Sequence, residues 1–192
     1  MKLVLGSTSP YRKKLLERLH LDFCCDSPDI DETPLENEDI KDMVVRLAIE
    51  KAKAVARRHP DSLIIGSDQS AVLKGEKLTK PGNFETAVEQ LKAASGQTVV
   101  FQTGLCLLNA ATGNIQSLCE PYSVQFKDLS ENMITRYLVK EEPYNCAGSF
   151  KSEALGIALF KRFEGEDPNS LIGLPLIKLV EFLANEGVSI LA

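Results

Sequence analysis

The chain has little histidine and a small, scattered set of cysteines. Its 2 histidines, His20 and His59, exclude a histidine-rich metal site and disfavour a Ser-His-Asp triad. Its 5 cysteines are an odd number, none forms a C-x-x-C pair, and Cys24 is adjacent to Cys25. Neither a disulfide framework nor a cysteine zinc site is therefore expected.

An excess of basic charge and long apolar runs are also missing. The net charge is -5, which disfavours wholesale binding of nucleic acid. No apolar run approaches the roughly 18–20 residues that span a bilayer, and the first residues turn polar too soon for a secretory signal. We therefore expect a cytoplasmic protein without nucleic-acid or membrane partners, in which any anion site is a local basic cluster.

The remaining composition is that of an ordinary globular chain of mixed α and β structure. It has 192 residues, of which 44% are hydrophobic and 26% charged, enough for one domain or two small lobes sharing a cleft. Hydrophobic patterning predicts strands over 2–6, 63–66, 97–109, 115–126 and 157–163, and helices over 11–21, 37–59, 83–94, 130–140 and 175–186. Segments 23–34 and 165–175 read as loops, and 74–76 as a turn. The order predicts a mixed sheet with helices on both sides.

The first candidate site is segment 7–14, where a strand gives way to small hydroxyl residues and then to a helix. The N–H groups and dipole at a helix N-terminus favour phosphate or carboxylate. Arg12 adds a forked donor for phosphate oxygens, and Lys13 adds a point charge. A plain helix cap with a solvated basic face is the alternative that the spacing leaves open.

The next candidates are carboxylates. Asp68 follows the apolar run 63–66, and carboxylates at the carboxyl ends of buried strands lie where α/β sheets bind ligands. It could hold a divalent cation or position an attacking water. Glu32, in an acidic loop with Asp29 and Asp31, could join Asp68 at a Mg²⁺ ion. A turn-capping aspartate and a solvated acidic loop are the structural alternatives.

Dispersed lysines form the last candidate set. Lys51 falls on or beside the apolar stripe of its predicted helix, where a lysine must reach solvent or meet an anion. Lys80 precedes a proline, and Lys151 follows a Gly-Ser-Phe turn. With Arg12 they could neutralise a triphosphate, although each alone is usually a surface residue.

Seven short motifs occur in a fixed order over essentially the whole chain. They are Ser7-x-Ser9-Pro10-x-Arg12, Asp31-Glu32, Glu50-Lys51-Ala52, Gly66-Ser67-Asp68-Gln69, Lys80-Pro81, Ala147-Gly148-Ser149 and Gly173-Leu174-Pro175. Each is weak alone, but together they resemble the Maf family of nucleoside triphosphate pyrophosphatases.

The resemblance implies a fold, a reaction and a set of site residues. The fold is an elongated mixed sheet flanked by helices, as in inosine triphosphatase, with a single domain over 1–192 whose two lobes share one deep active-site cleft. The reaction is cleavage between the α- and β-phosphates with a divalent cation, Mg²⁺ or Mn²⁺. The implied roles are Asp68 as proton acceptor; Tyr11, Gln69 and Glu153 in substrate choice; Ser7, Arg12, Lys51 and Lys80 in phosphate binding; and Glu32 with Asp68 at the metal.

Two motif details are similar to the branch of the family that hydrolyses 7-methyl-GTP. These are the Gly-Ser-Asp-Gln form at 66–69 and the Gly-Ser-Phe-Lys-Ser-Glu run at 148–153. We hypothesise that Tyr11, where that branch more often has tryptophan, stacks on the cationic methylated ring. Glu153 would accept hydrogen bonds from guanine and counter the ring charge.

Other functions stay open at this point. One is hydrolysis of dTTP or UTP. Gln69 and Glu153 disfavour it, because the resemblance implies other residues at these positions in the branch that acts on dTTP and UTP. Another is a nucleotide-binding regulator of cell-division arrest, a role linked to relatives of this family. A homodimer is a further expectation, because two-fold dimers are the commonest assembly of such chains.

Overall fold

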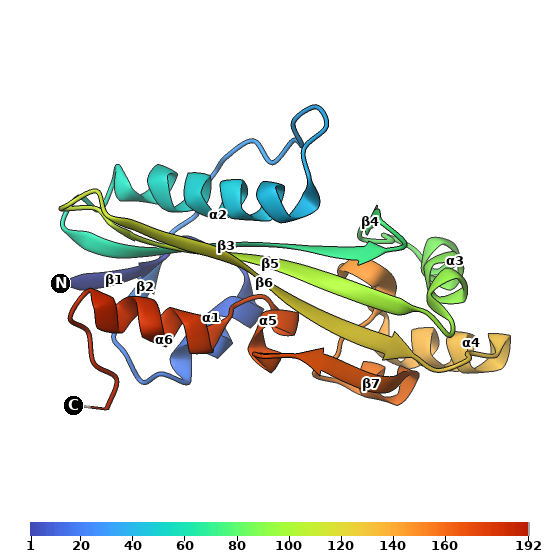
Figure 1. Ribbon diagram of the computed structural model, residues 1–192. Helices are drawn as coiled ribbons and strands as arrows, with labels where there is room; N and C mark the ends of the chain where they lie inside the picture. Colours follow the sequence, from blue (N-terminus) through green and yellow to red (C-terminus); the bar gives the residue numbers. More distant parts are fainter. Residues whose placement is uncertain (192) are drawn as a thin grey trace. The chain divides into compact units, whose positions relative to one another are not determined.

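The computed structural model describes residues 1–191 (Figure 1). The described elements are, in chain order, β1 (Lys2–Leu5), α1 (Pro10–Glu17), β2 (Phe23–Cys25), α2 (Ile40–Ala56), β3 (Ser62–Leu73), β4 (Glu76–Leu78), α3 (Phe84–Ala94), β5 (Thr98–Asn109), β6 (Ile115–Phe126), α4 (Glu131–Glu141), the 3₁₀ turns η1 (Ala147–Ser149) and η2 (Leu155–Leu159), β7 (Phe160–Gly165), α5 (Pro168–Ile172) and α6 (Leu176–Asn185). The chain divides into two compact units. The first comprises 1–69, 102–120 and 167–192, and the second comprises 70–101 and 121–166.

The strands form one mixed sheet. Their order is β2-β1-β3-β5-β6-β7, with β4 beside β3. β1 pairs in parallel with both β2 and β3, whereas β3–β4 and β6–β7 are antiparallel. The prediction of a mixed sheet in an α/β fold is therefore confirmed.

Helices cover both faces of the sheet in the first unit. Side chains alternate along β3, so Leu63 and Ile65 face α1 and α6 while Ile64 faces α2 (Figure 1). The larger core cluster joins these strand residues to leucines of the helices, Leu15, Leu16, Leu179 and Leu183 among them. The apolar stripes of the helices are what bind them to the sheet.

Two glycines let α2 lie directly on the sheet. A Cβ atom at Gly66 would stand 2.0 Å from the carbonyl oxygen of Ala48, and one at Gly104 would stand 2.1 Å from that of Val44. No side chain fits in either place. This close approach positions Lys51, which α2 carries one turn beyond Ala48, over the strand that carries Asp68.

The second unit has an aromatic core of its own. Phe150 makes edge-to-face contacts with Phe101, Phe126 and Phe160 at ring-centroid separations of 5.5, 5.4 and 4.9 Å. The predicted turn at 74–76 joins β3 to β4, and Lys74 and Gly75 both have positive φ, at 53° and 88°. Two positive φ values in succession are typical of a two-residue hairpin turn.

The prediction that the strand at 63–66 ends before Asp68 is wrong. β3 runs unbroken from Ser62 to Leu73, so Asp68 lies within the strand rather than beyond its end. A charged residue interrupts an apolar run in the sequence, but here Lys51 from α2 pairs with it. The pairing satisfies the buried carboxylate and lets the strand continue.

Other element boundaries also differ from the predictions. Segment 23–25 is a strand rather than a loop, because it pairs with β1 along its length. Segment 168–172 is the helix α5, capped by Asp167, and 157–159 is part of a 3₁₀ turn rather than a strand. The helix predicted over 11–21 ends at Glu17, and the one predicted from 37 begins at Ile40 because Asp39 caps it.

Candidate active site

The first predicted site segment forms a capped helix start. The Ser9 hydroxyl oxygen accepts from the backbone N–H of Arg12 at 3.4 Å, and Pro10 occupies the first turn of α1. The Ser7 hydroxyl is buried and accepts from the N–H of Ser9 at 3.1 Å. Tyr11, in the same first turn, is 40% exposed. The structure thus shows the helix cap, and phosphate binding by this segment stays a prediction.

The carbonyl of Gly173 ties three sequence motifs together. It accepts from Arg12 Nε at 2.8 Å and from the buried Ser67 hydroxyl at 2.9 Å. Gly173 has φ 123°, and a Cβ there would lie 3.3 Å from Arg12 Nε. Glycine therefore suits both the backbone conformation and the space that the guanidinium occupies.

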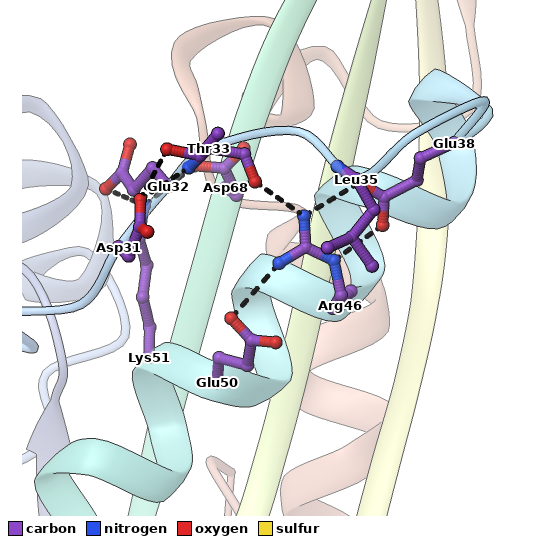
Figure 2. Close-up of polar contacts among 9 residues, drawn as sticks. All are labelled: Asp31, Glu32, Thr33, Leu35, Glu38, Arg46, Glu50, Lys51 and Asp68. Atoms are coloured by element: carbon purple, nitrogen blue, oxygen red, sulfur yellow. Dashed lines mark hydrogen bonds and ion pairs between the residues drawn. The ribbon is translucent and has the colours of Figure 1, made fainter.

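The centre of the site is a lysine held between two carboxylates (Figure 2). Lys51 Nζ lies 2.7 Å from Asp68 Oδ1 and 2.8 Å from Glu32 Oε1. Lys51 and Asp68 are 5% and 7% exposed, whereas the Glu32 side chain is 57% exposed. A buried charge of this kind persists only when it is paired, so each partner depends on the other.

Arg12 joins this cluster electrostatically. Burial lowers the pKa of Arg12, and the neighbouring carboxylates of Asp68 and Glu32 act in the opposite direction and raise it. An arginine stays protonated despite such a shift. Two cations thus face two carboxylates, and an arriving polyphosphate could exchange with the carboxylates for the same cations.

Gln69 lies beside the cluster but is turned toward the chain itself. Its amide nitrogen donates to the carbonyls of Ser170 and Leu171 at 2.6 and 3.2 Å and to the Thr103 hydroxyl at 3.0 Å. These bonds fasten α5 to β3 and β5. Gln69 thus has a structural role. Its role in substrate choice stays a prediction.

The remaining predicted residues belong to the second unit. Lys80 is exposed in the connection between β4 and α3, and exposed Glu153 accepts from the Ser152 hydroxyl at 3.2 Å. Lys151 pairs with Glu141 at 3.1 Å. The Lys51 cluster belongs to the first unit. The roles of these residues in binding substrate, and the cleft shared by the two lobes, therefore stay predictions.

Two carboxylates of the cluster could hold a divalent cation. Among residues 1–191, no group of three or more histidine, cysteine, aspartate or glutamate side chains could hold a metal ion. Glu32 and Asp68 nevertheless converge on one ammonium. Mg²⁺ is commonly held by one or two carboxylates together with substrate phosphates and water, and this pair matches that donor set.

Sequence reasoning missed the roles of Ser67 and Arg46. Ser67 stands in a quoted motif, but its partner Gly173 is 106 positions away, so no local pattern could reveal the bond. Arg46 lies four positions before Glu50, an arrangement typical of a solvent-exposed helical pair. Its contacts with Glu38 and Thr33 appear only once the loop has folded over α2.

Comparison with known proteins places the chain in a family. The family described as Maf-like protein matches residues 2–186. The chain belongs to this family. Relatives named 7-methyl-GTP pyrophosphatase come from Alcanivorax borkumensis, at 58% identity over 98% of this chain and 95% of that protein, and from Colwellia psychrerythraea, at 56% identity over 99% and 95%. The same name belongs to a Pseudomonas savastanoi protein, at 56% identity over 98% of each chain.

Solved structures give a much weaker likeness. The Ham1 protein of Staphylococcus aureus aligns with TM-score 0.47 and 16% identity over 67% of this Maf-like chain and 73% of its own. Separately, no helix within residues 1–191 is both long enough and apolar enough to cross a membrane.

Replacing Ser67 by alanine should weaken the hold of Gly173 on Arg12. Losing one hydrogen bond of this kind costs about 1 kcal/mol, and we expect a rise in the KM of the nucleotide of about fivefold with little change in kcat. Thermal unfolding would check the loss of stability, and steady-state kinetics would check KM and kcat. Ser170→Ala is the matched control, because the Ser170 hydroxyl also donates to a backbone carbonyl, that of Asp167 at 2.6 Å, and Ser170 bonds to Gly173 only through its backbone, which the change keeps. An equal rise in KM for both variants would contradict the claim that the bond between Ser67 and Gly173 holds Arg12 in place.

Proposed function

We propose that this Maf-like protein is a nucleoside triphosphate pyrophosphatase that hydrolyses 7-methyl-GTP to 7-methyl-GMP and pyrophosphate. The observation that carries the proposal is the buried Lys51–Asp68 pair, which Glu32 and Arg12 extend. The name shared by relatives at 56–58% identity supports the choice of substrate.

The cluster supplies what hydrolysis of a phosphoanhydride needs. Such reactions depend on neutralising the phosphate charge and orienting a water, with little covalent help from the protein. Lys51 and Arg12 would bind phosphate oxygens, which releases the Asp68 carboxylate from its lysine. Asp68 then takes a proton from the water as the water oxygen bonds to the α-phosphorus. The bond between the α-phosphorus and the bridging oxygen breaks, and its electrons leave with that oxygen on pyrophosphate.

A divalent cation, Mg²⁺ or Mn²⁺, is part of this proposal. Glu32 and Asp68 would hold it, because their carboxylates already converge on one point. When bound, the cation would neutralise charge on the phosphates. Asp68 can serve as proton acceptor or as metal ligand, and both roles use the same carboxylate.

Recognition of the methylated base is proposed to involve Tyr11 and Glu153. The exposed Tyr11 ring offers a face to a cationic ring, an attraction of about 0.5–2 kcal/mol. A glutamate carboxylate accepts from the N1–H and 2-amino groups of guanine and opposes the ring charge. A homodimer and a cytoplasmic location stay predictions.

The Glu153→Gln variant tests this recognition. Because glutamine lacks the negative charge, we expect the ratio of kcat/KM for 7-methyl-GTP to that for UTP to fall by about tenfold, the loss of one charge-assisted hydrogen bond. Glu166→Gln, another exposed glutamate of the second unit, is the control and should leave the ratio unchanged. A ratio unaltered in Glu153→Gln would overturn this part of the proposal.

A substrate panel tests the function itself. Pyrophosphate release would be measured from 7-methyl-GTP, GTP, dTTP, UTP and CTP, each with and without Mg²⁺. We expect metal-dependent turnover with 7-methyl-GTP preferred. Preference for dTTP or UTP would keep the reaction and discard the base recognition, and no turnover at all would favour the regulatory binding role.

A further inference from the structure

The loop that carries Glu32 is fastened to α2 by one arginine. Arg46 grips Glu38 with two parallel bonds, Nε to Oε1 at 2.5 Å and Nη2 to Oε2 at 2.7 Å, and its Nη1 reaches Glu50 at 3.2 Å (Figure 2). Glu38 also accepts from the N–H of Leu35 at 3.0 Å. The arginine thus closes the loop onto the helix that bears Lys51.

The same guanidinium holds the backbone next to Glu32. Arg46 Nη2 donates to the carbonyl of Thr33 at 3.3 Å. The N–H and hydroxyl of Thr33 donate in turn to Asp31 at 2.9 and 2.6 Å. Glu32 therefore lies between Asp31 and Thr33, which are hydrogen-bonded to each other. The Thr33 carbonyl is in turn bonded to Arg46 of α2.

Glu32 is the more exposed of the two carboxylates that pair with Lys51. It lies outside regular secondary structure, and its side chain is 57% exposed where it meets Lys51. The clamp is better shielded, with side chains of Arg46 and Glu38 exposed by 21% and 8%. The guanidinium lowers the pKa of Glu38 to about 2, so the clamp is ionised at neutral pH.

We propose that Arg46 is a positioning residue that holds Glu32 against Lys51 and so sets how well the site takes a metal-bound triphosphate. The proposal rests on the proposed function for its effect on catalysis, but not for its effect on the loop. A fork is needed because one side chain must meet both oxygens of Glu38 and the Thr33 carbonyl, and a lysine cannot do this with the same geometry.

Kinetics of Arg46 variants would test the effect on the reaction. Changes to residues that orient metal ligands typically cost 10- to 100-fold, so we expect Arg46→Lys and Arg46→Ala to lose about tenfold in kcat/KM and to require more Mg²⁺ for half-maximal rate. In a Glu32→Ala background the further loss should be less than about twofold, because the residue that is positioned has gone. Equal losses in both backgrounds, or full activity of Arg46→Lys, would overturn the proposal.

The matched control is Arg58→Ala. Arg58 fastens the start of the same loop to the turn that follows α2, through Asp26 at 2.9 Å and the carbonyl of Ser27 at 2.6 Å. Loss of this clamp should lower the melting temperature without changing the Mg²⁺ requirement. An equal change in the Mg²⁺ requirement for Arg58→Ala would show that general loosening of the loop, rather than Arg46, is responsible, and would overturn the proposal.

Amide hydrogen exchange separates failure of this inference from failure of the proposed function. It needs no substrate, and it also decides the question if Glu32→Ala is too slow to assay. We expect the N–H of Thr33 to exchange faster in Arg46→Lys than in the unaltered protein, while amides of β1 and β3 keep their rates. Unchanged exchange at Thr33 would contradict the positioning role, whatever the enzyme turns over.

Discussion

Replacement of Asp68 by asparagine should lower kcat on 7-methyl-GTP by about a thousandfold, a loss typical of removing a general base. Asparagine has nearly the same shape, and its amide oxygen can still accept from Lys51, which now lies 2.7 Å from Asp68 Oδ1. It cannot take a proton from water and is a poor metal ligand. The chemistry should therefore fail while the fold persists.

Steady-state and single-turnover kinetics of Asp68→Asn would be compared with those of Asp26→Asn. Asp26 also forms an ion pair with Arg58 and a hydrogen bond with His59, at 2.9 Å each, but it lies outside the Lys51 cluster. We expect Asp26→Asn to keep its kcat within about twofold, as surface changes usually have small effects. Near-normal turnover by Asp68→Asn would remove Asp68 from both its proposed roles.

The largest effect on stability is expected from adding one methyl group between α2 and the sheet. In Gly66→Ala the new Cβ would lie 2.0 Å from the carbonyl oxygen of Ala48 unless the backbone moves. Forcing atoms into packed backbone costs at least as much as overpacking a core, so we expect a loss of about 3 kcal/mol or more in the free energy of unfolding. The displaced helix would also carry Lys51 away from Asp68, so activity should fall with stability.

Denaturant unfolding of Gly66→Ala and Gly113→Ala would separate steric conflict from backbone strain. Gly113 has φ 78°, and a Cβ there would have no atom within 4 Å. Its replacement should cost only the strain of a left-handed conformation, about 1–2 kcal/mol, and should leave turnover intact. A loss at Gly113 as large as that at Gly66 would contradict the close packing of α2.

Local signals in the sequence predicted much of the fold. Ser9, Asn83 and Ser130 each cap a helix near where the pattern placed its start, because a cap bonds to backbone only three positions away. The turn at 74–76 was likewise readable from its lysine and glycine. Helix α5 was missed although Asp167 and Pro168 carry a start signal, because five residues are too few to show a period.

The site was only partly predictable, because its bonds join distant segments. The lysine on an apolar stripe was a sound signal, since Lys51 is buried against Asp68. The strand was nevertheless predicted to stop before Asp68, because its partner lies 17 positions earlier on another element. The bonds of Ser67 to Gly173 and of Gln69 to Ser170 span more than 100 positions, and only the folded chain brings them together.

The most direct test of the central claim is the identity of the products from 7-methyl-GTP. The claim is that the cluster of Lys51, Asp68 and Glu32 directs water to the bond between the α- and β-phosphates. Chromatography of the nucleotide products and separate assays for pyrophosphate and for inorganic phosphate would be run on one reaction with Mg²⁺. The account predicts 7-methyl-GMP and pyrophosphate in equal amounts. Formation of 7-methyl-GDP with inorganic phosphate would contradict it.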